Sequence, residues 1–258
     1  MKHFAYIIGI VTMLLSCSHI DESEQLIYVQ QEAAQRVVLL EDFTGQRCVN
    51  CPKGTEIINQ LQETYGNHLV AVGIYSGEFG KLPNGKLMPL TTTTGCEYFE
   101  HYVKGYGQPI GMVNRHAPQN YTEWTATVRE EITKPSPVDL SLTATLHDEN
   151  IMITIQEDAK GDNIEGKLQV WVLEDGITAL QFMPDGSTNK NYIHHHVFRT
   201  SVNGTWGDPI TLNAGEQKSQ QLTQAIDGDW NKDNLSIVAF IYNSNGVLQA
   251  AKTKVTTN

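Results

Sequence analysis

Residues 37–54 most constrain how this chain can fold, because a strand, a turn and a cysteine pair follow one another there. Residues 37–40 are a short, uncharged, β-branched run, which predicts a buried strand. Thr44 and Gly45 predict the turn. Cys48 and Cys51 come next, at the start of a helix predicted over residues 52–65, where residues three apart lie on one face.

Two interpretations of the cysteine pair stay open. Cα atoms at this spacing can reach the separation that a disulfide needs. A thiol at a helix N-terminus also lies near unpaired N–H groups, which favour the thiolate, and Arg47 adds a positive charge beside Cys48. Cys48 and Cys51 therefore form either a dithiol redox centre or a small structural disulfide that closes a turn.

This stretch resembles the thioredoxin superfamily in its strand, its acidic residue Asp42 and its Cys-x-x-Cys-Pro motif. The resemblance implies that Cys48 attacks, that Cys51 resolves, and that Asp42 lies buried behind the disulfide and relays protons. Arg47 stands where thioredoxins usually carry Trp, and Val-Asn replaces their usual Gly-Pro dipeptide.

A second match lies downstream. Residues 69–75 predict a strand that completes a βαβ unit, and Gln108-Pro109 precedes a further strand at residues 110–114. By resemblance to thioredoxins, Pro109 would be cis and Gln108 would contact substrate. The predicted substrate-binding residues are Gln108, Pro109 and Arg47. A helix over residues 121–133 would close a thioredoxin-like α/β domain spanning residues 36–134.

The N-terminus has the pattern of a bacterial lipoprotein signal. Lys2 precedes an apolar stretch at residues 4–15, and Leu-Leu-Ser-Cys ends at Cys17. Residues 1–16 are thus predicted to be a signal peptide, Cys17 to be lipidated, and residues 17–35 to be an acidic tether. The alternative is an ordinary secretory signal.

The net charge of −11 makes nucleic acid an unfavourable partner. The sequence contains no other apolar run long enough to cross a membrane. With Cys17 assigned to lipid, Cys96 is left beside the pair, which does not make a disulfide framework.

The second half, residues 135–258, changes to a period of two, with alternating apolar residues near 138–146 and 151–155 and further strands at 168–173, 235–242 and 247–255. Short strands separated by turn signals predict an all-β, immunoglobulin-like sandwich domain. The expected fold class is therefore an α/β thioredoxin-like domain followed by that sandwich.

Three sets of residues have the side-chain types of metal ligands. Cys48, Cys51, Cys96 and His101 have the ligand types of a zinc site but irregular spacing. His194 and His196 would share one face of a strand, with no third ligand identified. The acidic segment 227–233 lacks the glycine and glutamate expected of a calcium loop and predicts a polar turn. We expect no metal and no cofactor.

In combination, the lipobox, the Cys-x-x-Cys-Pro motif, the segment 109–115 and the β-rich second half resemble the Omp28-related outer-membrane lipoproteins. The resemblance implies anchoring to the outer membrane by lipid, at either its periplasmic face or the cell surface. Two functions remain open. One is thiol–disulfide exchange with envelope or surface proteins that contain disulfides. The other is non-catalytic surface binding or adhesion with a structural disulfide.

Overall fold

The computed structural model describes residues 35–257, which belong to one compact unit. The predicted signal peptide, the lipidation of Cys17 and the acidic tether lie outside the described residues, apart from the last residue of the tether. No helix among the described residues is long and apolar enough to cross a membrane.

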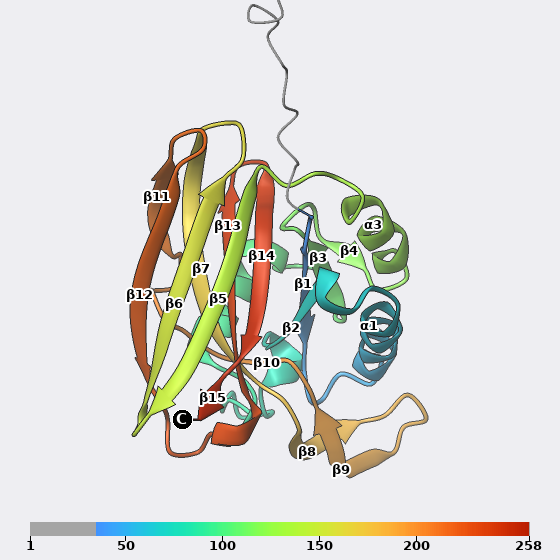
Figure 1. The fold of residues 1–258 in the computed structure, drawn as a ribbon. Coiled ribbons are helices and arrows are strands. Elements are labelled where there is room, and N and C mark those ends of the chain that lie inside the picture. The colour runs from blue at the N-terminus through green and yellow to red at the C-terminus, as the bar shows by residue number, and fades with distance from the viewer. Residues whose placement is uncertain (1–34, 258) are drawn as a thin grey trace, which may run out of the picture. The chain divides into compact units, whose positions relative to one another are not determined.

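Strands dominate the described chain, and Figure 1 shows their arrangement. The helices are α1 (Cys51–Tyr65), α2 (Thr93–Tyr98) and α3 (Trp124–Glu131), with shorter helical turns at Gly66–His68, Glu78–Gly80, Phe99–Val103 and Lys232–Asn234. The strands are β1 (Val38–Thr44), β2 (Leu69–Tyr75), β3 (Ile110–Val113), β4 (Gln119–Asn120), β5 (Val138–His147), β6 (Asn150–Ala159), β7 (Ile164–Glu174), β8 (Ile177–Phe182), β9 (Thr188–His194), β10 (Val197–Ser201), β11 (Asp208–Leu212), β12 (Gln217–Ala225), β13 (Leu235–Asn243), β14 (Gly246–Lys254) and β15 (Thr256–Thr257).

One nine-stranded sheet runs through most of the molecule, in the order β14-β13-β7-β10-β2-β1-β3-β4, with β11 also paired to β7. β1 and β2 are parallel and are joined through α1, so the predicted βαβ unit is confirmed. β3 runs antiparallel to β1. The short strand β10 connects the two halves of the sheet, because it pairs with β2 on one side and β7 on the other.

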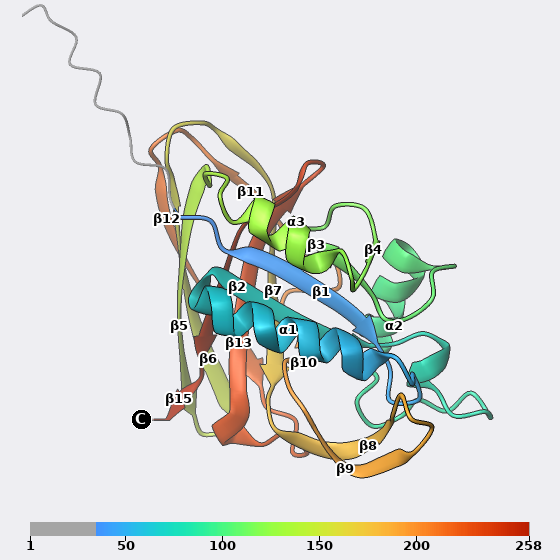
Figure 2. The ribbon, with the colours of Figure 1, turned by 90° about the vertical axis from the view of Figure 1, so that its right-hand side faces the viewer.

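The two faces of this sheet are covered differently. At the β1–β3 end, α1 and α3 bury one face around Leu40, Leu61 and Trp124. At the β7–β13–β14 end, the same face packs against a second, four-stranded sheet of order β12-β6-β5-β15. Figures 1 and 2 show the helices and this second sheet as separate covers.

The opposite face carries a core that is shared along the sheet. Leu39 and Phe43 of β1 belong to the same buried cluster as Trp171 of β7 and Phe240 of β13. Tyr98 of α2 is also fully buried in this cluster. The aromatic side chains therefore join the first and second halves of the sequence in one core.

This architecture corrects the predicted fold class. An α/β thioredoxin-like domain followed by a separate immunoglobulin-like sandwich is wrong, because the sheet that begins with β1–β3 continues through β10 into β7, β13 and β14. The described chain is mainly β, with three α-helices against fifteen strands. Strands from the predicted ranges 36–134 and 135–258 therefore share one sheet.

Candidate functional site

The cysteine pair is a disulfide at the start of α1. The Cα atoms of Cys48 and Cys51 lie 5.3 Å apart, which confirms the predicted bond. The amide of Cys48 donates to the carbonyl of Gly45 at 3.0 Å, and Cys51 is the first residue of α1, with Pro52 following. Proline suits this position because the first helical N–H has no partner within the helix. The local sequence thus fixes the turn and the helix start around the disulfide.

The turn needs glycine at position 45. A Cβ added to Gly45 would lie 2.6 Å from the backbone carbon of Phe79. The same two segments are joined by a bond from the Arg47 amide to the Phe79 carbonyl at 3.1 Å. The Arg47 guanidinium donates to the Lys81 carbonyl at 2.8 Å. Arg47, predicted to stabilise a thiolate, therefore holds the 79–81 segment against the disulfide loop.

Pro109 lies against the first turn of α1. The Gln108–Pro109 peptide bond is cis, as the resemblance implied. A Cβ added to Gly54 would meet the Pro109 ring at 3.4 Å. The Gln108 side chain donates to the carbonyls of Thr44 and Ser76, at 2.8 and 3.2 Å. Gln108, predicted to contact substrate, is thus occupied in joining the ends of β1 and β2.

Asp42 is a buried carboxyl on the helix-facing side of β1. It lies on the same face of the strand as Val38 and Leu40, which pack under α1. Its side chain is 2% exposed, and among the described residues its Oδ1 atom has no hydrogen-bond partner. Burial raises the pKa of Asp42 to about 8, because removal from water disfavours the charged form. At neutral pH this carboxyl is therefore mostly protonated.

A buried tyrosine and histidine lie near Asp42. The Tyr75 hydroxyl, at the end of β2, shares a hydrogen bond of 2.7 Å with Nδ1 of His194, the last residue of β9. Burial raises the pKa of Tyr75 well above its usual value, and the charge of Asp42 adds to this shift. Burial lowers the pKa of His194 to about 4, so its imidazole is neutral at pH 7.

The β8–β9 hairpin lies beside the disulfide loop at the start of α1 (Figure 2). The amide of Phe182 donates to the Gln46 carbonyl at 2.8 Å, and the Gln46 side chain donates to the Leu180 carbonyl at 3.0 Å. The Gln181 side chain donates to the Cys48 carbonyl at 3.0 Å. Both cysteines are 2% exposed. Little of either cysteine is therefore exposed to an external thiolate in this conformation.

The histidines and the third cysteine do not form the metal sites considered from sequence. His196 lies beyond β9 with a positive φ of 55° and approaches Asp175 at 3.0 Å, whereas His194 turns inward to Tyr75. Cys96 is a free, half-buried thiol whose pKa is raised by burial. Within residues 35–257, no group of three or more His, Cys, Asp or Glu side chains is arranged to hold a metal ion.

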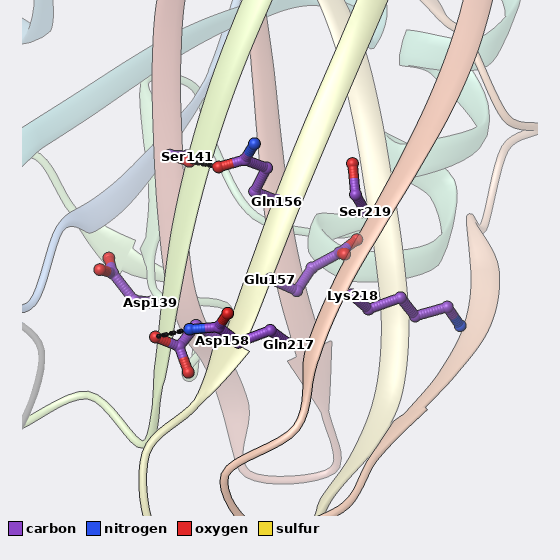
Figure 3. A pocket seen from close by; sticks show the side chains of 8 residues that line it. All are labelled: Asp139, Ser141, Gln156, Glu157, Asp158, Gln217, Lys218 and Ser219. Atoms are coloured by element: carbon purple, nitrogen blue, oxygen red, sulfur yellow. Dashed lines mark hydrogen bonds between the residues drawn. The ribbon is translucent and has the colours of Figure 1, made fainter.

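A separate polar pocket lies on the four-stranded sheet, away from the cysteines (Figure 3). Asp158 of this pocket pairs with Lys160 and accepts a bond of 3.4 Å from Gln217. The pocket combines carboxylates, amides and hydroxyls, and it is lined by Asp139, Ser141, Gln156, Glu157, Asp158, Gln217, Lys218 and Ser219. It has polar groups for binding and no nucleophile paired with a base.

The structure therefore gathers the disulfide, Asp42 and Pro109 around the start of α1. Gln181 and His194 were missed as partners of this site, since they lie more than a hundred residues from the motif. The adjacent histidines at 194–196 were the available signal, but the sequence showed no partner for them and no third metal ligand.

Two solved structures resemble this chain in fold. The solved structure of HBP35 of Porphyromonas gingivalis has 16% identity and a TM-score of 0.68, covering 87% of this chain and 76% of that one. Protein AGR_C_4864 from Agrobacterium tumefaciens has 17% identity and a TM-score of 0.50, covering 85% of this chain and 95% of that one. These likenesses show the fold alone.

A domain of the outer membrane lipoprotein Omp28 from Porphyromonas gingivalis has 23% identity and a TM-score of 0.36, covering 48% of this chain and 91% of that one. Among curated proteins, no sequence matches this chain. The family model described as outer membrane protein Omp28 matches residues 97–258, which is more than half of the sequence. The chain belongs to the Omp28 family of outer membrane proteins.

Proposed function

We propose that this chain is a lipid-anchored outer-membrane protein that performs thiol–disulfide exchange through Cys48 and Cys51. Membership of the Omp28 family supports the location. The cysteine pair at a helix N-terminus supports the chemistry, because that position stabilises a thiolate. The partners would be envelope or surface proteins that carry disulfides or dithiols.

The observation that carries the proposal is the buried Asp42 carboxyl. A buried carboxyl without a hydrogen-bond partner for one oxygen destabilises a fold, and residues of this kind concentrate at functional sites. Asp42 lies on the strand that leads into the disulfide turn and faces α1. Its pKa of about 8 suits proton exchange with a thiol near neutral pH.

The exchange transfers two electrons between the cysteine pair and a partner dithiol. A partner thiolate attacks the Cys48 sulfur, the Cys48–Cys51 bond breaks, and Cys51 leaves as a thiolate that takes the proton of Asp42. The partner's second thiol loses its proton to water and attacks the partner sulfur of the mixed disulfide, releasing Cys48. The partner dithiol is oxidised and the pair is reduced, with two electrons transferred. The reverse sequence oxidises the pair.

The anchor would be lipid on Cys17, as the lipobox predicts. Inhibition of lipoprotein signal peptidase with globomycin should then cause the unprocessed precursor to accumulate. Unchanged processing under globomycin would refute lipidation.

The first test of the chemistry is the reduction potential of the pair, measured by equilibration with glutathione and mass spectrometry of alkylated thiols. A potential between about −120 and −270 mV lies among catalytic dithiols and supports exchange. A potential below about −300 mV marks a structural disulfide and overturns the proposal.

Trapping in cells gives a second test. A Cys51→Ser variant should accumulate mixed disulfides with envelope proteins, visible on a non-reducing gel, because Cys48 can attack but nothing resolves the product. A Cys48→Ser/Cys51→Ser double variant is the matched control, since it keeps Cys96 alone. Identical gels for the two variants would contradict exchange.

The second candidate is a non-catalytic surface protein with a structural disulfide. The 2% exposure of both cysteines beneath the β8–β9 hairpin favours it, because an attacking thiolate needs access. The polar pocket of Figure 3 offers hydrogen-bonding groups to a surface ligand. A low reduction potential with no trapped partners is the outcome that selects this candidate.

A further inference from the structure

The β8–β9 hairpin has the features of a separable cover. It forms a two-stranded sheet of its own, and within residues 35–257 it pairs with neither of the larger sheets. Its contacts with the disulfide loop are few and polar: the Phe182 amide bond to Gln46, the Gln46 side-chain bond to Leu180, and the Gln181 bonds to Cys48 and Gly45. Opening the hairpin would break these bonds and the packing of Ile177 and Ala179 against the cluster of Tyr75, Leu90 and Val197, without unpairing a main sheet.

We propose that the β8–β9 hairpin is an autoinhibitory cover over the Cys48–Cys51 disulfide, latched by the buried Tyr75–His194 hydrogen bond and by Gln181. This inference rests on the proposed function for its biological meaning. Its physical content, that the hairpin controls access to the sulfurs, stands on the contacts alone. The cover would be displaced by a partner protein before exchange.

The latch joins the base of the hairpin, where His194 of β9 pairs with Ile177 of β8, to the main sheet. Tyr75 ends β2, whereas His194 ends β9, and the two rings meet edge to face with centroids 5.4 Å apart. Both side chains are buried, at 7% and 1% exposure. A buried hydroxyl that loses its partner retains its full desolvation cost. Removing the imidazole should therefore favour the open hairpin.

Gln181 is the second attachment. Its side chain is 3% exposed, and its amide nitrogen reaches the carbonyls of Gly45 and Cys48, at 3.4 and 3.0 Å. These carbonyls belong to the turn that carries the disulfide. The hairpin thus binds the same backbone that a partner must approach to reach Cys48.

The latch should also respond to acid. His194 has a closed-state pKa of about 4, lowered by burial from the usual 6.5, so the closed state binds fewer protons than the open state. The contribution of His194 to the stability of the closed state is then fully present above pH 6.5 and is lost as pH falls through 4. The titratable groups around His194 are Tyr75 on β2, Tyr192 and His195 on the hairpin side, and Asp42 on β1 beside Tyr75.

Tyrosines do not ionise between pH 5 and 7, and Asp42 stays protonated there while it remains buried, since its pKa is about 8. If opening also hydrates Asp42, its ionisation favours the open state as pH rises and opposes the His194 effect. The acid response is therefore measured against a His194 variant that keeps Asp42.

The test measures how fast a phosphine reductant opens the disulfide in the folded full chain, by quenching with a thiol-alkylating reagent and counting labels by mass spectrometry. A His194→Phe variant should be reduced roughly tenfold faster or more than wild type. The control is His195→Ala, which changes the more exposed neighbouring imidazole. Equal rates for wild type and both variants overturn the cover.

A second variant decides the matter if His194→Phe does not fold, as judged by a cooperative urea transition. Gln181→Ala removes the bonds to Cys48 and Gly45 and leaves the Tyr75–His194 latch in place. It should also speed reduction several-fold. A rate unchanged from wild type would overturn the proposal on this variant alone.

The pH dependence is measured as the ratio of wild-type to His194→Phe reduction rates. This ratio cancels the change in phosphine reactivity with pH, which affects both proteins equally. Going from pH 7 to 5, this ratio should rise about twentyfold, as expected for a group whose pKa moves from about 4 closed to 6.5 open. A ratio that does not change with pH would remove His194 from the latch.

These rates separate the two proposals. Faster reduction in the variants together with a potential below about −300 mV would mean a covered structural disulfide, so the cover holds and exchange fails. A catalytic potential with unchanged rates would mean exchange without this cover.

Discussion

Asp42 gives the clearest prediction at the scale of single residues. Its folded pKa of about 8 lies above the usual 3.8, so its contribution to the free energy of unfolding is present below pH 4 and is lost as pH rises through 8. Asp42→Asn should therefore gain stability relative to wild type as pH rises, reaching about 2 kcal/mol or more at pH 8. Urea midpoints at pH 5, 7 and 9 measure this.

The matched control is Asp162→Asn, because Asp162 is exposed. Its urea midpoints should follow those of wild type at every pH. If the Asp42 variant also followed wild type, Asp42 would not be a protonated buried carboxyl. That result would contradict its proposed role in proton transfer.

A second residue prediction concerns the buried ion pair of Glu41 and Arg115. The Arg115 Nη2 atom lies 3.2 Å from Glu41 Oε1, and the guanidinium carbon lies 4.3 Å from the Tyr242 ring centroid. Glu41→Gln leaves a buried charge uncompensated and should lower the free energy of unfolding by about 3–5 kcal/mol. The control, Glu100→Gln, breaks an exposed pair with Lys104 and should leave the urea midpoint unchanged. Equal effects of the two substitutions would contradict this account.

At this scale, the residues of the local motif were predicted from the sequence, and their distant partners were not. Cys48, Cys51 and Asp42 lie within one segment, and the resemblance implied that Asp42 is buried, although the strand predicted at residues 37–40 extends to Thr44 and includes Asp42. His194 and Gln181 reach the same site from a hairpin that folds back across the chain. Nothing in a short window distinguishes a buried histidine from an exposed one, so the adjacent histidines were wrongly grouped on one face.

At the scale of elements, apolar runs were predictable and polar strands were not. The predicted strand at residues 69–75 is confirmed as β2, because its apolar run is buried along its whole length. β12 (Gln217–Ala225) was missed, since its glutamine-rich sequence has no apolar alternation. Its strand conformation comes from nine backbone pairings with β6. Tertiary context decides such strands more than local preference.

The attachment of α3 to the sheet gives the element prediction. Trp124 is fully buried, and a Cβ on Gly111 of β3 would lie 2.6 Å from its indole, so the ring lies directly on the strand backbone. Trp124→Ala should lower the free energy of unfolding by about 3–5 kcal/mol, measured in urea. Tyr106→Ala is the control, since that side chain is 51% exposed and should cost much less. A small loss at Trp124 would show that α3 is not held by this contact.

At the scale of the whole molecule, the shared sheet could not be predicted from sequence. Its central connection is β10, a five-residue strand whose pairing with β2 is the single register match of Val197 with Gly73. The Gly73 amide donates to the His196 carbonyl at 2.8 Å, which adds one more bond across this boundary. Such a short strand has too little sequence to reveal its partners, whereas the change to a period of two from residue 135 onward predicted a separate domain.

The shared sheet predicts that the first half of the chain cannot fold alone. A fragment of residues 36–134 would lack β10, the neighbour of β2, and would lose the part of the shared core that Trp171 and Phe240 contribute beside Leu39 and Phe43. An unpaired central strand and an open apolar face do not support a cooperative fold. Circular dichroism in urea should show no cooperative transition for this fragment, and one transition for residues 35–258. A cooperative transition in the fragment would instead mean that residues 36–134 form an autonomous domain, and that β10 joins a sheet already stable without it.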